Sequence, residues 1–187
     1  MLVKKGRNRI VLVLSGVAIK FPLLHLRTVH KLLRSWQKNG SQYIKQYWND
    51  TPIHALKYWL FVGVGNNWRE FTFYWRTRHP LLRPTYCSIL GLVNIQRAGN
   101  PIVERNEYDF AHQMLDLLGS SGLWIDDIHH FTNPENFCFN NGRIQIFDYG
   151  SRLTQKVIGE VGTKILNGFD PNYKRVQTDR SGQERSL

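Results

Sequence analysis

Cysteine and long apolar runs are both scarce in this chain of 187 residues. Its two cysteines, Cys87 and Cys138, are too few for a disulfide framework, and neither has zinc ligands at the usual spacing. No run approaches the roughly 18 consecutive apolar residues that a membrane span requires. From these absences we expect a soluble protein of a reducing, cytoplasmic compartment, with no membrane partner.

Acidic residues are scarce as well, because 14 Asp and Glu residues stand against 25 Lys and Arg residues and give a net charge of +11. This excess favours attraction to polyanions. Nucleic acid, a phosphorylated cofactor and an acidic protein surface all qualify, and charge alone does not choose among them. Hydrophobic residues, by contrast, make up 42% of the chain and aromatic residues 13%. The chain can therefore bury a core in one domain, or in one domain with an appendage.

Strand and helix patterns alternate in the first half of the chain. Residues 9–22 are rich in β-branched side chains around a Ser-Gly turn and predict a β-hairpin. Residues 67–78 predict a helix that is apolar on almost every side and carries Glu70. Residues 86–96 predict two short strands joined at a glycine, and residues 94–99 predict a connector that leaves the sheet.

Residues 23–66 lack a clean period after their first leucines, and we expect an insertion with one or two helices there. Basic and aromatic residues mix in this stretch, a combination that could form a nucleic-acid surface. A local aromatic core with a solvated basic face is the plainer interpretation. The residues concerned are Lys31, Arg34, Trp36, Lys38, Tyr43, Lys45, Tyr47, Trp48, Lys57 and Trp59.

The second half of the chain predicts two helices with a hairpin between them. One helix covers about residues 107–118, with apolar positions on one face, and the other covers about residues 157–166. A polar tail over residues 171–187 is expected to be disordered.

The residues best suited to chemistry lie on this hairpin, within residues 133–150. Apolar residues flank the Asn-Asn-Gly of residues 140–142, a sequence that predicts a tight hairpin with a positive-φ turn. The hairpin returns Asp148 toward Asn136 and places two oxygen ligands on one side, as a metal-bound triphosphate requires. Gly150 lets the backbone turn sharply after the aspartate. An ordinary hairpin with turn-forming residues at its end is the plainer alternative.

In these motifs the chain resembles the protein-kinase-like superfamily. Residues 134–136, Pro-Glu-Asn, are similar to the catalytic-loop motif, and residues 148–150, Asp-Tyr-Gly, are similar to the Asp-Phe-Gly metal-binding motif. Residues 17–20, Val-Ala-Ile-Lys, are similar to the third-strand motif of the same family. The resemblance covers about residues 9–152 without the insertion at 23–66. In size the chain is closest to minimal atypical kinases of bacteria and their viruses.

The resemblance implies an α+β protein with a two-lobed, protein-kinase-like fold. Residues 1–99 would form an N-terminal lobe without a clear glycine-rich phosphate loop, whose place is taken by Lys-Gly-Arg-Asn at residues 5–8. Residues 100–170 would form a minimal C-terminal lobe, truncated because little sequence follows the Asp-Tyr-Gly motif. The resemblance also implies ATP and Mg²⁺ as cofactors.

The resemblance assigns a role to each matching residue. Lys20 would contact the α- and β-phosphates, and Glu70 would hold this lysine by an ion pair. Asn136 and Asp148 would bind the magnesium ions. The hinge residues whose backbone would hydrogen-bond the adenine edge are Gln96, Arg97 and Ala98.

The catalytic base departs from the family pattern. The aspartate expected five residues before Asn136 is replaced by Phe131, which cannot accept a proton. Asp127 could take that role if a bulge in the loop presents it to the site. Two hypotheses follow. One is a phosphotransferase that acts on a small molecule or an unconventional protein substrate. The other is a pseudokinase scaffold that holds a partner protein or nucleic acid through its basic insertion.

Overall fold

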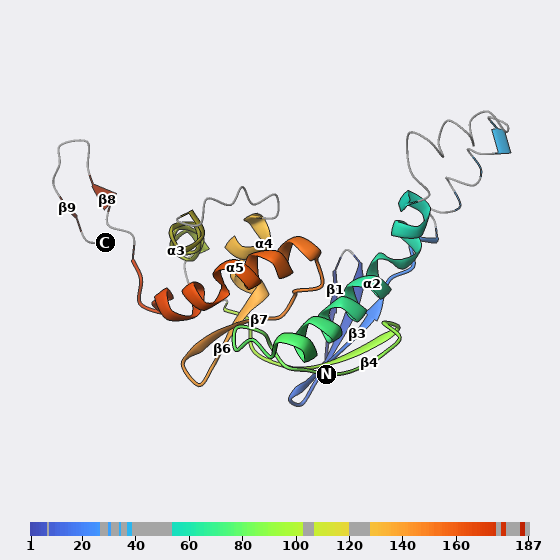
Figure 1. Cartoon of the computed structure of the whole chain (residues 1–187), viewed down its shortest axis with the longest axis horizontal. Coiled ribbons are helices and arrows are strands. Elements are labelled where there is room, and N and C mark those ends of the chain that lie inside the picture. Colours follow the sequence, from blue (N-terminus) through green and yellow to red (C-terminus); the bar gives the residue numbers. More distant parts are fainter. Residues whose placement is uncertain are drawn as a thin grey trace. The chain divides into compact units, whose positions relative to one another are not determined.

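In the computed structural model the chain divides into two compact units with mixed α+β structure (Figure 1). Unit 1 comprises Met1–Arg76 and Pro84–Ala98, and unit 2 comprises Thr77–Arg83 and Gly99–Leu187. The structure describes residues 1–6, 8–26, 30, 34, 37–38, 54–102, 107–119, 128–174, 177–178 and 184–185, with only the backbone for 54–60, 177–178 and 184–185. Among these residues no helix is both long and apolar enough to cross a membrane.

Unit 1 is built on a five-stranded antiparallel sheet in the order β1-β2-β3-β5-β4. Its strands are β1 (Leu2–Lys5), β2 (Arg9–Leu14), β3 (Val17–Pro22), β4 (Thr85–Ile89) and β5 (Val93–Arg97). β2 and β3 form the hairpin that the sequence predicts over residues 9–22, and β4 and β5 join at a turn where Leu90 and Gly91 have positive φ. The sequence does not predict β1, because its four residues are all exposed and show no alternation of apolar and polar side chains.

Helix α2 (His54–Thr77) belongs to the same unit (Figure 1). It starts well before the helix predicted over residues 67–78 and includes the last part of the stretch 23–66, where the sequence predicts an insertion with one or two helices. Glycines in the first half of α2 disfavour a helix on intrinsic propensity, but packing overrides that preference. At Gly63 a Cβ atom would lie 2.5 Å from the Asn8 carbonyl oxygen and 2.8 Å from Pro22 Cβ, so only glycine permits this close approach. The rest of the insertion, apart from a few residues, lies outside the described residues.

Unit 2 contains helices packed around a short hairpin. Its elements are α3 (Glu107–Gly119), α4 (Ile128–Thr132), the 3₁₀ helix η1 (Pro134–Asn136), β6 (Phe137–Asn140), β7 (Arg143–Ile146), α5 (Arg152–Gly168), β8 (Gln177–Thr178) and β9 (Glu184–Arg185). Fully buried side chains from α3, α4, β6 and α5 form its core, among them Phe110, Phe131, Phe137 and Ile165. Within the tail at 171–187, β8 and β9 pair with each other.

His79 fastens the start of unit 2 to α5. Its Nδ1 accepts a hydrogen bond from the Leu81 amide at 3.2 Å, and its Nε2 lies 3.4 Å from the Thr163 hydroxyl. A Cβ atom at Gly162 would come within 2.9 Å of the His79 ring, so the two surfaces fit closely. Because Nδ1 accepts a bond in this arrangement, the ring is held in its neutral form. Burial accordingly lowers the pKa of His79 below its ordinary value of 6.5.

We expect the stability of unit 2 to fall as the pH drops below about 6.5. The unfolded chain binds the His79 proton more readily than the folded chain does. The contribution of the neutral ring is therefore complete above the unfolded pKa and is lost as the pH falls through the lower, folded pKa. Urea unfolding between pH 5 and 8 measures this slope in the parent and in His79→Gln. An unchanged slope in His79→Gln would show that other groups cause the pH dependence.

Candidate functional site

The register of the sheet in unit 1 gathers polar side chains on the face that carries α2. Directly paired residues of an antiparallel sheet point to the same face. Lys20 pairs with Val11 on β2 and with Asn94 on β5, and Arg9 lies two residues before Val11 on the same strand. The buried polar residues of these strands are Arg9, Lys20, Thr85, Asn94 and Gln96. A polar layer is thus placed beneath a helix, where apolar packing is the usual arrangement.

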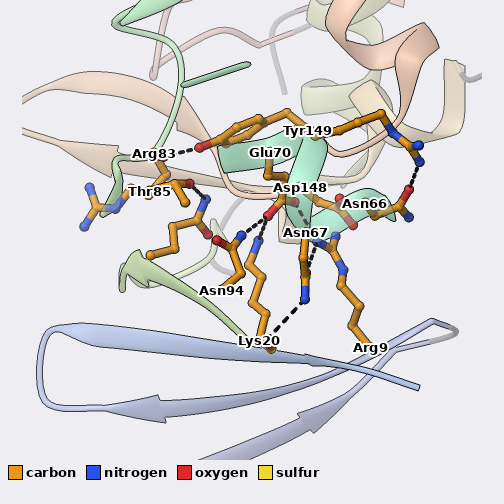
Figure 2. Close-up of polar contacts among 12 residues, drawn as sticks. Arg9, Lys20, Asn66, Asn67, Glu70, Arg83, Thr85, Asn94, Asp148 and Tyr149 are labelled. Atoms are coloured by element: carbon orange, nitrogen blue, oxygen red, sulfur yellow. Dashed lines mark hydrogen bonds and ion pairs between the residues drawn. The ribbon is translucent and has the colours of Figure 1, made fainter. Parts of the chain in front are cut away.

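Glu70 of α2 is the centre of this layer and is 0% exposed (Figure 2). Its Oε2 accepts hydrogen bonds from Lys20 Nζ at 2.9 Å and from Asn94 Nδ2 at 3.0 Å. Its Oε1 accepts from Arg9 Nη1 at 2.7 Å. Two buried cations therefore meet on one buried carboxylate, and each contact is a charge-assisted hydrogen bond of normal length.

Asn67 connects the same helix to two strands of the sheet. Its side-chain amide donates to the Lys20 carbonyl at 3.3 Å and to the Gly91 carbonyl at 2.9 Å, and its oxygen accepts from Arg9 at 3.3 Å. Asn67 lies three residues before Glu70 and hence on the same helical face. The position of α2 over β3 is consequently fixed by hydrogen bonds around Lys20 as well as by the ion pair itself.

The ion pair between Lys20 and Glu70 that the resemblance implies is present, but sequence reasoning missed three residues that hydrogen-bond to this pair. These are Arg9, Asn67 and Asn94. A local signal exists for two of them. The Ser-Gly turn sets the hairpin register and puts Arg9 on the Lys20 face, and the three-residue spacing puts Asn67 beside Glu70. Asn94 required knowledge that β5 lies next to β3, which no local pattern contains.

The residues of the predicted hinge lie at the end of β5, where part of their backbone is already engaged. The Arg97 amide donates to the Pro84 carbonyl and the Ala98 amide to the Gly16 carbonyl, at 2.8 and 2.9 Å. The side-chain amide of Gln96 is buried and lies 3.5 Å from the Thr85 hydroxyl. An adenine edge could use the Arg97 and Ala98 amides only if these bonds broke, so binding of adenine by this stretch stays a prediction.

In unit 2 the hairpin of β6 and β7 brings the predicted metal ligands to one end. Asn141 and Gly142 have φ values of +51° and +76°, as a two-residue hairpin turn of the primed type requires. The Phe147 amide donates to the Asn136 carbonyl at 2.9 Å, one step beyond the last paired residues of the strands. Asp148 is the next residue. The predicted return of the chain toward Asn136 is therefore confirmed.

His130 of α4 contacts both predicted ligands through groups that a metal would not use. Its Nε2 lies 2.6 Å from the Asp148 carbonyl oxygen, and its own carbonyl accepts from Asn136 Nδ2 at 2.9 Å. The first contact requires the proton to be on Nε2. The hydrogen bond to the His130 carbonyl fixes the orientation of the Asn136 amide. Its nitrogen is engaged within the protein, and its oxygen is the atom that would coordinate a cation.

The backbone around Asp148 is held by two further hydrogen bonds in unit 2. The buried Tyr149 hydroxyl donates to the Arg83 carbonyl at 2.6 Å, which Figure 2 also shows. The Gln155 side chain donates to the Tyr149 carbonyl at 2.9 Å. With the His130 contact, three side chains fix the Asp148-Tyr149 backbone, an arrangement that suits a preorganised ligand more than a mobile turn.

The donor set fits Mg²⁺ better than a transition metal. In the part of the chain that the structure describes, no group of three or more His, Cys, Asp or Glu side chains is placed to hold a metal ion. Mg²⁺ needs only one or two protein oxygens, because it keeps water and takes phosphate oxygens as its other ligands. The amide oxygen of Asn136 and the carboxylate of Asp148 are ligands of that kind.

The position of the expected catalytic base is occupied by core packing. Phe131 on α4 is 0% exposed, and its ring lies 6.4 Å from that of Phe137. It offers no acceptor to a substrate. Asp127, the other candidate for this role, lies outside the described residues.

Comparisons of the chain with protein-family models, with curated proteins and with solved structures find no match. Function is therefore inferred from the two groups of residues described above. Lys20 and Glu70 lie in unit 1, and Asn136 and Asp148 lie in unit 2.

Proposed function

We propose that this protein binds ATP together with Mg²⁺ in the manner of protein kinases. In those enzymes a lysine on the third strand contacts the nucleotide phosphates and pairs with a glutamate of a helix. The observation that carries the proposal is the buried pair between Lys20 Nζ on β3 and Glu70 Oε2 on α2, at 2.9 Å.

Stability alone is a weak explanation for burying this pair. Burial of an ion pair removes two charges from water, and well-packed apolar residues often stabilise a protein as well or better. A lysine that is 4% exposed is therefore better explained by what its charge does for a ligand. Arg9 adds to this argument, because a second cation keeps the Glu70 carboxylate paired when Lys20 engages phosphate oxygens.

The second unit would supply the metal ligands. Asn136 and Asp148 offer one amide oxygen and one carboxylate from the same end of a hairpin, and His130 orients the first and holds the backbone of the second. Bound Mg²⁺ would neutralise charge on the nucleotide phosphates. Both halves would then belong to one kinase-like two-lobed fold, in which unit 1 corresponds to the N-terminal lobe and unit 2 to the C-terminal lobe.

Within this proposal the reaction is phosphoryl transfer to a small molecule or an unconventional protein substrate, with Asp127 as the base. One observation favours a second function. Phe131 is sealed in the core at the position where the family places its base, and this supports a pseudokinase that binds nucleotide but transfers nothing. Such a protein would act as a scaffold for an acidic protein or for nucleic acid through its basic residues.

Calorimetry with ATP in the presence and absence of Mg²⁺ tests the proposal. We expect magnesium-dependent binding by the parent and at least about tenfold weaker binding by Lys20→Met, because the phosphate contact and its charge are lost. Lys156→Met is the matched control, since this lysine is 65% exposed on α5 and only 4.0 Å from Glu160. If the parent shows no binding, or Lys20→Met binds like the parent, the nucleotide site is elsewhere or absent.

A phosphotransfer assay separates the two functions. If Asp127 is the base, Asp127→Asn should bind ATP normally and lose most of its turnover. An Asp127→Asn variant with full turnover would remove this residue as the base. A parent protein that binds ATP and Mg²⁺ but never releases or transfers the γ-phosphate would support the scaffold instead.

A further inference from the structure

One face of α2 carries large exposed aromatic side chains. Phe61, Trp68 and Trp75 are 55%, 43% and 48% exposed, and they recur every seven residues, which places them on one side of the helix. Glu70 and Phe73, by contrast, are buried on the opposite side. A surface helix normally presents polar residues to water, so an aromatic outer face calls for a partner.

The spacing of this face matches that of a helix-packing seam. Phe61, Val64, Trp68, Phe71 and Trp75 follow one another at intervals of three, four, three and four residues, the pattern with which one helix packs along another. Phe71 lies between the two tryptophans, with ring centroids 5.7 Å from Trp68 and 6.1 Å from Trp75. We call these five residues the aromatic seam.

Small and basic residues border the aromatic seam on one side. The small residues on this side are Gly65 and Thr72. Arg69 and Arg76 each follow a tryptophan of the seam directly in the sequence. The Arg69 guanidinium lies over Gly65, where a Cβ atom would come within 3.2 Å of it, and it donates to the Asn66 side chain. Arg69 thus places positive charge beside the seam, and the Arg76 guanidinium lies 5.9 Å from the centre of the Phe73 ring.

The other side of the seam continues into the turn between β4 and β5. Val64 contacts Gly91 so closely that a Cβ atom there would lie 2.9 Å from its side chain, and Trp75 donates to the Thr85 carbonyl at 3.0 Å. Beside these contacts, Leu90 is 73% exposed. The apolar surface therefore extends beyond the helix to this turn.

We propose that the aromatic seam docks an amphipathic helix of an acidic partner protein. The apolar side of that helix would pack on the seam, and its acidic side chains would meet Arg69 and Arg76. Two features of the chain select this occupant. The seam has the period of helix packing, and the net charge of +11 favours a partner of opposite charge.

The same features argue against two other occupants. A second copy of the chain would bring a net charge of the same sign, and its own arginines, toward this surface. Single-stranded nucleic acid stacks on open ring faces, but here Phe71 is tilted by 41° and 53° against its two tryptophan neighbours, so the rings pack on one another.

The test uses a synthetic amphipathic peptide with leucine at the seam positions and glutamate on both flanks, labelled for fluorescence anisotropy. We expect the parent protein to bind the peptide. Trp68→Gln should bind at least about tenfold more weakly, because it lacks an aromatic side chain that the complex would bury. The double variant Arg69→Gln/Arg76→Gln should bind more weakly at low salt and lose much of its salt dependence. Leu153→Gln on α5, where the leucine is 45% exposed, is the matched control and should bind like the parent.

Several results would overturn the proposal. The proposal is ruled out if the parent does not bind the peptide at all, if a peptide with lysine in place of glutamate binds as tightly as the glutamate peptide, or if Trp68→Gln binds as tightly as the parent. A dimer in sedimentation that Trp68→Gln dissolves would instead assign the seam to a second copy. Binding of an oligothymidylate, or of vesicles that contain anionic lipid, that Trp68→Gln abolishes would assign it to those ligands. Circular dichroism confirms that each variant is folded, which is expected because Trp68 is exposed.

Discussion

Replacing Glu70 with glutamine is expected to lower the free energy of unfolding by about 3–5 kcal/mol. The substitution keeps the shape of the side chain but removes the one buried carboxylate that Arg9 and Lys20 share, at 2.7 and 2.9 Å. Both cations then keep an amide in place of the carboxylate that they share, and removing one partner of a buried ion pair is strongly destabilising. Equilibrium unfolding in urea measures the loss, provided that the parent unfolds in a single transition.

Glu160→Gln is the matched control for this substitution. Glu160 lies 4.0 Å from Lys156 on the exposed surface of α5, and such a pair contributes at most about 0.5 kcal/mol. A loss at Glu70 as small as that at Glu160 would contradict the idea that the carboxylate is needed to hold two buried cations.

A triple variant distinguishes the destabilisation caused by removing one charge from the contribution of the whole ion-pair network to stability. In Arg9→Met/Lys20→Met/Glu70→Leu all three charges are replaced by apolar side chains of comparable size, and such replacements are often neutral or stabilising. We expect this protein to fold with stability near that of the parent and to bind no ATP. Retention of nucleotide binding by the triple variant would show that the network is structural only.

The parts of the fold that the sequence predicts correctly are those fixed by local chemistry. The hairpin of β6 and β7 follows from an Asn-Gly turn between alternating residues, and the turn sets its register. The hairpin of β2 and β3 follows in the same way from its Ser-Gly turn. Once the register is known, the face on which Lys20 lies is known as well, because successive side chains of a strand point to opposite faces of the sheet.

The parts that the sequence misses depend on contacts far apart in the chain. Helix α2 continues through Gly63, where Pro22 and the Asn8 carbonyl lie too close for any larger residue. Asn94 joins Glu70 only because β5 pairs with β3 across a long connection. Propensity and periodicity describe neighbours in sequence, so neither could reveal these partners.

The role of His130 shows the same limit within the candidate site. In the sequence it is one of two adjacent histidines, and adjacent residues of a helix point in different directions. In the structure it orients the Asn136 amide and holds the Asp148 backbone, whereas the side chains of both ligands stay separate from the imidazole contact. The Asp148 side chain can therefore be altered while the contact of the imidazole with the Asp148 carbonyl is kept.

Asp148→Asn is accordingly expected to abolish the Mg²⁺-dependent part of ATP binding and to leave unit 2 folded. The contact of His130 is to the Asp148 carbonyl, and an asparagine keeps that carbonyl but loses the charge that attracts the cation. If ATP and Mg²⁺ are present at about one hundred times the Kd, the parent should gain about 2.7 kcal/mol, or an increase in Tm of about 5–10 °C. Thermal unfolding with ATP, with and without Mg²⁺, measures how much of this gain the variant retains.

Asp116→Asn on α3 is the control in the same unit. Asp116 is exposed and accepts a hydrogen bond from the Tyr173 hydroxyl at 3.1 Å, a contact that an asparagine oxygen can also make. Its thermal shift with ATP and Mg²⁺ should equal that of the parent. If Asp148→Asn also keeps the full shift, the hairpin binds no metal. Lys20→Met then distinguishes the remaining alternatives. Loss of binding in that variant would leave a phosphate contact without magnesium, and unchanged binding would place the nucleotide away from both groups of residues.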